Sequence, residues 1–569
     1  MKLGAFTFVL HSHLPYCRQA GRWPHGEEWI HEAASECYVP LLNALYDLRE
    51  EGVGFKTTIG LTPVLVEQLR DELVKEHFRE YVTTLINAAE KDIERHRAVG
   101  ATRLAELATY SRTEYAHILS SYEERFGGDI VGAYKSLQDS GHIEIATSAA
   151  THGFLPLMSR DSTIAGQIGT GVRSYERIFN RHPRSIWLPE CAYRPARTEM
   201  RDGAMIARPG LEWFLEQEGL KVFFAETHAV EGGLPVGKAA GDAFGPYGEV
   251  QRRYRVPIPE GSRRTGGTTF QPYYVEDSDV AVIARNNRTG MQVWSAEHGY
   301  PGDFWYREFH KRDGSSGLRY WRTTGRRVDL ADKAEYEPAR AREQVHHHAR
   351  HFAQLVEELI ADYHDSTGKY GIMSCAYDTE LFGHWWYEGI DWIREVLLLL
   401  ANSDVVDLTT AGDFVEQHPP EESISLPESS WGQGGNFFTW NNVDTEWMWP
   451  IIHDAERRLE RIVDTCGDPT GDEVDVLRQT TREALLLQSS DWPFLVTTGQ
   501  AREYANQRFT THAERFNELA SFLDEGRLGP EAQAKALELY ERDKLFDDLD
   551  WRLFGSQSGA QVRAKSAAR

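Results

Sequence analysis

Short β-rich segments alternate with long helical stretches along most of the chain, and this alternation constrains the fold more than any other feature. The predicted strands are residues 4–10 (GAFTFVL), 55–61 (FKTTIGL), 142–148 (HIEIATS), 185–189 (SIWLP), 221–226 (KVFFAE), 292–297 (QVWSAE) and 370–377 (YGIMSCAY). Strands that are separated by helices usually pair in parallel, because each helix carries the chain back across the sheet. The pattern therefore predicts an α/β protein with a parallel sheet.

Polar and aromatic residues follow almost every predicted strand. The segments HSHLPY, THGFLP, ECAYRP, ETH, EHGYPG and DTELFGHWW all occupy this position. In a β/α barrel the carboxyl ends of the strands meet on one face, where the chemistry lies, whereas an open sheet gathers such residues only at a switch point. The sequence therefore favours a barrel slightly short of the usual eight strands over an open doubly wound sheet.

We place the barrel in residues 1–415. Composition along the chain suggests further units within and after it. Residues 90–135 are charged and have apolar residues at helical spacing, which predicts a helical insertion. Residues 230–280 are rich in glycine and predict a mobile loop region near the barrel mouth. The chain then predicts a helical C-terminal domain in 416–550, and a disordered tail in 551–569.

The charge of the chain argues against some partners. With 87 acidic and 62 basic residues, the net charge of -25 repels phosphate backbones and anionic lipids, whereas a neutral substrate is unaffected. No apolar stretch approaches the roughly 20 residues that a membrane-spanning helix needs. The five cysteines are widely spaced and form no CxxC pair, which is typical of a reducing compartment. We therefore expect a cytoplasmic protein that binds neither nucleic acid nor membrane.

Two acids at predicted strand ends are candidates for catalysis. Glu190 lies between Pro189 and the YRP segment, close to two aromatic residues, and Asp378 follows the seventh predicted strand. Two carboxyl groups on one barrel face suit glycoside cleavage, in which one protonates the leaving oxygen and the other attacks or activates water. The structural alternatives are a surface glutamate at a helix start for Glu190 and a helix N-cap for Asp378.

The histidines support a rival hypothesis. His11 and His13 are two residues apart, so in a strand their side chains point to the same side. With His152, His228 or His298 and Asp378 they would supply the ligands of a metal-dependent hydrolase. A hydrogen-bonding pair is the plainer alternative. Cys191 is a less favoured candidate for a nucleophile, because no base partner is identifiable for it.

Tryptophans occur in segments that do not have helical periodicity. Trp431 and Trp440 lie in the glycine-rich segment SWGQGGNFFTWNNVDTEW, which favours a wall on which sugar rings stack. Asp491 and Trp492, in SSDWPF, are a weaker signal of the same kind, and helix packing is the alternative for them.

Five segments together resemble glycoside hydrolase family 57. They are HSHLPY (11–16), GHIEIATSAATHGFLP (141–156), WLPECAYRP (187–195), YDTELFGHWW (377–386) and SWGQGGNFFTWNNVDTEW (430–447), in the order of the family and over most of the chain. The resemblance implies an incomplete (β/α)7 barrel with a helical insertion and an α-helical C-terminal domain, in agreement with the strand count. It implies a retaining reaction on an α-glucan, with neither a cofactor nor a metal ion.

The resemblance also implies roles for individual residues. The nucleophile of the family corresponds to Glu190 and its general acid/base to Asp378. Substrate-binding positions correspond to His11, His13, His152, Trp294, His384, Trp431 and Trp440, and we add Asp491 and Trp492 as further candidates for substrate binding.

Three segments resemble the 1,4-α-glucan branching enzymes of this family: GRWPHGEEWIHEA (21–33), VWSAEHGYPGDFWYREFHKRD (293–313) and SSDWPFL (489–495). This resemblance implies transfer of a glucan chain to a 6-hydroxyl group, with Tyr247 as the counterpart of a loop tyrosine that covers the site. The implied substrate is amylose, glycogen or a starch-like glucan, and the expected assembly is a monomer or small homo-oligomer. An α-amylase or 4-α-glucanotransferase of the same family is the first alternative, and a metal-dependent hydrolase or a glucan-binding protein without activity is more remote.

Overall fold

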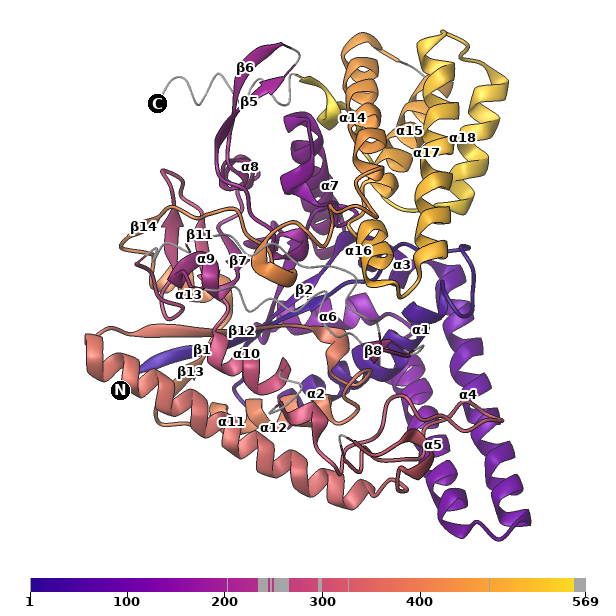
Figure 1. Ribbon diagram of the computed structural model, residues 1–569, viewed down its shortest axis with the longest axis vertical. Helices are drawn as coiled ribbons and strands as arrows, with labels where there is room; N and C mark the ends of the chain where they lie inside the picture. Colours follow the sequence, from indigo (N-terminus) through magenta and orange to yellow (C-terminus); the bar gives the residue numbers. More distant parts are fainter. Residues whose placement is uncertain are drawn as a thin grey trace.

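Seven parallel strands form the centre of the computed structural model, which describes residues 2–201, 203–233, 266–294, 299–325, 327–469 and 471–556 and the backbone of 244–245 and 248–249 (Figure 1). The strands are β1 (Gly4–Ser12), β2 (Thr57–Leu61), β3 (Ile143–Ser148), β4 (Ser185–Trp187), β7 (Val222–Ala225), β11 (Ala281–Ala284) and β12 (Gly371–Asp378). Nearly all of their residues are buried, as expected of a parallel sheet that is covered on both faces.

The sheet curls into a barrel that is not fully closed. Its strands lie in the order β12, β1, β2, β3, β4, β7, β11, and every neighbouring pair is parallel. Between β11 and β12 the described residues form a single parallel bridge, from Arg285 to Ser374, in place of a ladder. The predicted incomplete (β/α)7 barrel is therefore confirmed.

Further short strands extend or flank the barrel. β13 (Val406–Leu408) pairs with β1, β10 (Tyr273–Val275) runs antiparallel to β11, and β14 (Ser423–Ile424) pairs with β10. Two hairpins lie outside this sheet: β5 (Arg197–Arg201) with β6 (Ala204–Arg208), and β8 (Phe244–Gly245) with β9 (Gly248–Glu249). Tyr247 and much of the predicted loop region 230–280 lie outside the described residues, whereas β10 gives the end of that region a regular structure.

The predicted sixth strand, residues 292–297, is wrong. Helix α10 (Asn287–Trp294) occupies the described part of it, and the sixth barrel strand is β11. Asn286 begins the helix, because its side-chain oxygen accepts a hydrogen bond from the backbone of Thr289 at 3.1 Å. β11 has only four residues, and periodicity does not distinguish so short an apolar run from other structures.

Helices cover the outside of the barrel. They are α1 (Glu28–Ala33), α2 (Val39–Glu50), α3 (Pro63–Arg70), α6 (Ile130–Asp139), α7 (Asp161–Phe179), α8 (Leu211–Gln217), α9 (Thr227–Glu231), α11 (Pro338–Thr367), α12 (Gly389–Ala401) and α13 (Ala411–Gln417). Gly171 allows α7 to pack directly on the end of β3, because a Cβ atom there would lie 2.2 Å from the carbonyl oxygen of Ser148. No described helix combines the length and the apolar character that a membrane span requires.

A helical hairpin projects from the barrel in the region of the predicted insertion. Helices α4 (Glu72–Ala98) and α5 (Thr102–Ser120) pack against each other at the lower right of Figure 1. Asp71 caps α4 by accepting hydrogen bonds from the backbone of Leu73 and Val74. The hairpin therefore begins well before residue 90, where we predicted the insertion to start.

Helices also make up most of the C-terminal part of the chain. They are α14 (Met448–Thr465), α15 (Asp472–Leu487), α16 (Asp491–Thr498), α17 (Arg502–Asp524) and α18 (Pro530–Arg542), at the upper right of Figure 1. The predicted start of a disordered tail at residue 551 is wrong. Trp551 and Phe554 are only 4% and 1% exposed, and they lie in a short helical turn that packs on α7. Residues 557–569 lie outside the described part of the chain.

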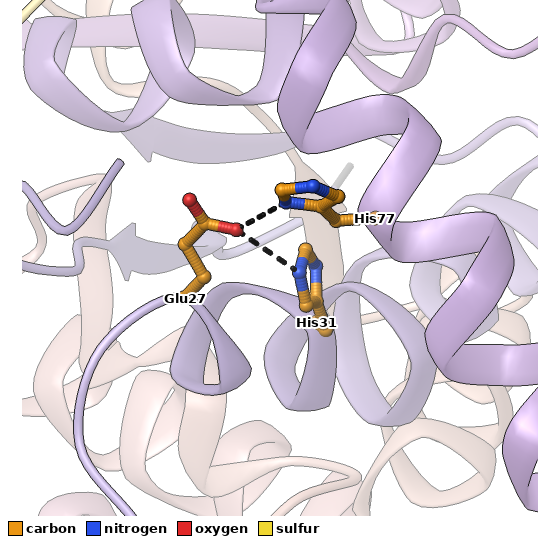
Figure 2. Close-up of side chains that lie close together, drawn as sticks. All are labelled: Glu27, His31 and His77. Atoms are coloured by element: carbon orange, nitrogen blue, oxygen red, sulfur yellow. Dashed lines mark hydrogen bonds and ion pairs between the residues drawn. The ribbon is translucent and has the colours of Figure 1, made fainter. Parts of the chain in front are cut away.

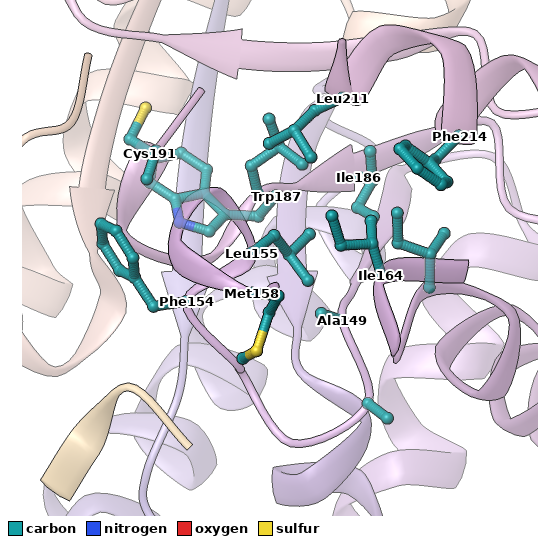
Figure 3. Close-up of a cluster of buried hydrophobic side chains, with 14 of the residues drawn as sticks. Ala149, Phe154, Leu155, Met158, Ile164, Ile186, Trp187, Cys191, Leu211 and Phe214 are labelled. Atoms are coloured by element: carbon teal, nitrogen blue, oxygen red, sulfur yellow. The ribbon is translucent and has the colours of Figure 1, made fainter. Parts of the chain in front are cut away.

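One apolar core connects the barrel strands with these C-terminal helices. Figure 3 shows Trp187 and Ile186 of β4 packed with Phe154, Leu155 and other buried side chains. The same cluster continues into Trp440, Leu485 and Trp492. The segment that follows β4 and contains Glu190 therefore packs directly against the apolar core.

Candidate active site

The backbone at Glu190 has an unusual conformation. Glu190 has φ 60° and ψ 24°, and Cys191, the next residue, has φ 51°. A left-handed conformation costs a residue with a side chain about 1–2 kcal/mol, so it persists only where neighbours enforce it. Here the backbone N–H of Trp431 donates to the Glu190 carbonyl at 3.1 Å, and that of Cys191 donates to Leu188 at 2.8 Å. The turn holds the carboxylate of Glu190 in one position.

Glu190 is 8% exposed, and its carboxylate accepts two hydrogen bonds. The indole N–H of Trp431 donates to Oε2 at 2.8 Å, and the hydroxyl of Ser490 donates to Oε1 at 2.8 Å. Burial raises the pKa of Glu190, whereas these two donors lower it because they stabilise the ionised form. The pKa of Glu190 is raised overall, and the two donors limit this rise by favouring the carboxylate, the form that can act as a nucleophile.

A chain of hydrogen bonds leads from β1 to Glu190. Because the Ser490 hydroxyl donates to Glu190, its oxygen accepts from Nδ1 of His152, 2.9 Å away. Nε2 of the neutral His152 is then an acceptor, and Nε2 of His11, 3.2 Å away, is the donor. Burial and the charge of His13 keep the pKa of His11 and of His152 well below the ordinary value, so both rings are neutral. This chain fixes the tautomers of both histidines.

His13 has the opposite electrostatic character. Its Nε2 lies 3.0 Å from Oδ1 of Asp491, and its ring stacks on that of His152 at 3.8 Å. Burial alone would lower the pKa of His13, but the Asp491 carboxylate, with smaller contributions from Glu190 and Glu380, raises it above the ordinary value. The protonated, positively charged form of His13 is therefore favoured near Glu190. Among the described residues, no group of potential metal ligands contains His11 or His13.

Asp378 ends β12, next to β1, and its register partner there is His11. Although it precedes a helical turn (Thr379–Leu381), its side chain makes no capping hydrogen bond, so the carboxyl group remains available for chemistry. Burial raises its pKa well above the ordinary value, and the charges of Glu380 and Glu190 raise it further. A protonated carboxyl group is the form that a general acid requires.

Two residues at the site were not predicted. Glu380 accepts hydrogen bonds from the backbone N–H of His13, at 3.2 Å, and from the hydroxyl of Tyr38, and burial raises its pKa to about 7. Ser490 is the second. Both lie within segments that we had selected from the sequence, DTELFGHWW and SSDWPF. The position of Glu380, two residues after Asp378, could have indicated that it belongs to the site.

The aromatic residues have different surroundings. Trp431 is 8% exposed and lies against Trp187, with ring centroids 4.9 Å apart. Trp440 and Trp492 are both 0% exposed: Trp440 stacks on Phe154, and the indole of Trp492 donates to the Leu486 carbonyl. The packing of these tryptophans shows no surface prepared for a sugar ring. Their contact with a sugar therefore stays a prediction.

The remaining predicted residues that the structure describes make no hydrogen bond to the Glu190 carboxylate. His384 lies 2.6 Å from Oε2 of Glu36; burial opposes ionisation of Glu36, but Arg319 and His384 lower its pKa to about 2. Trp294 ends α10 and packs against a second apolar cluster. Burial raises the pKa of the Cys191 thiol well above its ordinary value, so it is not an activated nucleophile.

Two family models match the chain. Glycosyl hydrolase family 57 matches residues 7–427, and the model described as 1,4-alpha-glucan branching enzyme, C-terminal, matches residues 451–554.

Individual proteins are similar over nearly the whole chain. A 1,4-alpha-glucan branching enzyme of Thermococcus kodakarensis is 45% identical over 95% of this chain and 77% of its own length. The crystal structure of a branching enzyme from that archaeon gives a TM-score of 0.87 at 44% identity and covers 97% of both chains. A branching enzyme structure from Pyrococcus horikoshii gives 0.86 at 40% identity, covering 98% of this chain and 97% of its own. An alpha-amylase from Thermotoga maritima gives 0.80 at 29% identity, covering 97% and 99%. Because the first model spans well over half of the residues, the protein belongs to glycosyl hydrolase family 57.

Proposed function

We propose that the protein is a 1,4-α-glucan branching enzyme, which cleaves an α-1,4 linkage and transfers the released chain to a 6-hydroxyl group of a glucan. The observation that carries the chemistry is the buried Glu190 carboxylate with two hydrogen-bond donors, on the same barrel face as the protonated Asp378. The match of residues 451–554 to a branching-enzyme model supports transfer over hydrolysis.

The reaction is a retaining double displacement. Asp378 donates its proton to the glycosidic oxygen while Glu190 attacks the anomeric carbon, which leaves a glycosyl group covalently bound to Glu190. Asp378 then takes the proton from the acceptor hydroxyl, whose oxygen attacks the anomeric carbon and releases Glu190. Trp431 and Ser490 stabilise Glu190 as the carboxylate before the first step and after the second.

The nature of the acceptor decides between branching and hydrolysis. A glucan 6-hydroxyl yields an α-1,6 branch, whereas water yields a new reducing end, so the site must exclude water while the intermediate exists. In our proposal Tyr247 covers the intermediate and Trp294 and Trp431 line the glucan groove, whereas the fully buried Trp440 supports the segment that carries Trp431. His384, Asp491 and Trp492 complete the substrate-binding set.

Hydrolysis is the second candidate function, and the similarity to the alpha-amylase of Thermotoga maritima favours it. To distinguish the two, the purified protein is incubated with amylose and followed by proton NMR of the anomeric region and by a reducing-end assay. New α-1,6 signals with few reducing ends support branching. Reducing ends without α-1,6 signals mean an amylase, and no change in either measurement contradicts both functions.

The setting of the reaction is also a proposal. The net charge of -25 and the unpaired cysteines support a cytoplasmic enzyme that acts on a neutral glucan, without nucleic acid or membrane as a partner. We propose a monomer or small homo-oligomer that needs no cofactor.

A further inference from the structure

Outside the active site, the described residues contain three groups of histidine and carboxylate side chains close enough to share a cation. They are Glu27, His31 and His77; Asp92, His96 and Asp313; and Glu483, His512 and Asp543. The second and third groups already contain a cationic side chain. Arg95 lies 2.6 Å from Asp92 and 2.7 Å from Asp313, and Arg515 pairs with Asp543. Among the described residues, no arginine or lysine pairs with Glu27.

The first group joins two separate elements (Figure 2). Glu27 and His31 are four residues apart at the start of α1, and His77 comes from α4. Oε2 of Glu27 lies 2.6 Å from Nδ1 of His77 and 3.9 Å from Nε2 of His31. Oε1 of Glu27 accepts a hydrogen bond from the backbone N–H of Gln19 at 2.6 Å. Figure 2 shows both imidazole rings directed at the same carboxylate oxygen.

His31 is the member of this group that protein contacts do not explain. It is 5% exposed; its Nδ1 is buried without a hydrogen bond to a described residue, and its Nε2 lies 3.9 Å from the Glu27 carboxylate, beyond hydrogen-bond distance. Its ring also lies near the rings of Phe78 and Tyr81. Buried polar groups are nearly always hydrogen-bonded, and an exception often marks an ion or a water molecule.

From this geometry we propose that Glu27, His31 and His77 form a Zn²⁺ site. Two imidazole nitrogens and one carboxylate oxygen suit Zn²⁺, whereas Ca²⁺ and Mg²⁺ prefer oxygen ligands alone. With bonds of about 2.0–2.1 Å, ligand atoms on a tetrahedral Zn²⁺ lie about 3.3 Å apart. The two distances to the Glu27 oxygen, 2.6 and 3.9 Å, lie on either side of this value, so each changes by only about 0.6–0.7 Å on binding.

The location gives the site a structural role. The His77 side chain is 16% exposed, which leaves a path for the ion and for a water molecule as fourth ligand. Arg22 is close enough to His31 to act on it electrostatically, and its guanidinium lies 3.6 Å from the Glu80 carboxylate, which offsets the positive charge. A bound ion would connect the helical hairpin to α1 and would stabilise the folded protein in proportion to its binding free energy. Neither Glu190 nor Asp378 is among its ligands, so we expect it to take no part in the glucan reaction.

The test uses the full-length protein, freed of metal with a chelator and dialysed. Titration with ZnCl₂ should give one tightly bound equivalent per chain and raise the thermal midpoint, whereas CaCl₂ and MgCl₂ should do neither. CoCl₂ should give the visible absorption of a four-coordinate ion with nitrogen and oxygen ligands. His31→Phe, which suits the neighbouring Phe78 and Tyr81 rings, should lose that equivalent, the absorption and the thermal shift.

Two more variants complete the test. His77→Gln should also lose the equivalent, which covers the case that His31→Phe misfolds. His117→Ala, a change at an exposed histidine on α5 of the same hairpin, should keep it. Wild-type protein that binds no Zn²⁺, or equal stoichiometry and equal Co²⁺ spectra in the wild type and both ligand variants, would overturn the proposal.

Discussion

The hydrogen bond from Ser490 to Glu190 can be tested by the removal of one oxygen atom. Ser490→Ala deletes the donor to Oε1 and leaves the second donor, Trp431, in place. A hydrogen bond to a charged group contributes about 1.5–3 kcal/mol, and one pKa unit corresponds to about 1.4 kcal/mol. The pKa of Glu190 should therefore rise by roughly one to two units.

The sign of the effect on catalysis follows from the role of Glu190. The nucleophile acts as the carboxylate, so the acid limb of the kcat/KM profile follows its pKa and should move to higher pH by the same one to two units. At a pH below both limbs, kcat/KM should fall by about 10- to 100-fold. At a pH well above them, the deficit should be much smaller. The assay is branching or cleavage of amylose as a function of pH.

The chain contains a matched control for this change. Ser174 is also buried, and its hydroxyl donates to the Oε1 atom of Glu67 at 2.8 Å, the same bond at the same length but between α7 and α3. Ser174→Ala should lower the free energy of unfolding without moving the acid limb. If the limb stays in place in Ser490→Ala, or moves equally in both variants, the assignment of Glu190 as the titrating nucleophile is refuted.

Three further predictions concern the acids and the chain end. Glu190→Gln and Asp378→Asn should each lower kcat by roughly 10²- to 10⁴-fold with an unchanged circular dichroism spectrum, and near-normal turnover would remove that residue from the mechanism. Glu380→Gln removes a negative charge that raises the pKa of Asp378, so the basic limb of kcat/KM should move to lower pH; a fixed limb would contradict this coupling. Phe554→Ala should lower the free energy of unfolding by about 3–5 kcal/mol in denaturant titrations, and a neutral result would return residues 551–556 to the tail.

The sequence predicted the barrel best where strands are long or end in a distinctive motif. β1 and β12 have nine and eight residues, and each is followed by residues that look like a site. β11 failed both criteria, because its four residues lead into Arg285 and the N-cap of α10. The end of the folded chain was misplaced for a related reason. Trp551 and Phe554 are two apolar residues without periodicity, and only their packing on α7 makes them part of the core.

The candidate site was predictable in its residue types but not in its contacts. Glu190, Asp378 and the histidines follow strands, and parallel strands bring their ends together. Ser490 lies 300 residues from Glu190 and Trp431 lies 241 residues from it, and no local pattern relates such positions. The surroundings of the tryptophans were equally unpredictable from the sequence. Trp431 and Trp440 occupy the same glycine-rich segment, yet only Trp431 contacts the Glu190 carboxylate.

These long-range contacts have a consequence for how activity depends on folding. The barrel supplies the Glu190 carboxylate in a strained turn and a buried position, and both the burial and the charge of Asp491 raise its pKa. The two donors that counter this effect come from beyond the barrel strands: Trp431 follows β14, and Ser490 precedes α16. The ionised nucleophile is therefore a property of the barrel and the C-terminal helices together. Loosening of α16 should therefore displace Ser490 from Glu190 and weaken catalysis before it unfolds the barrel.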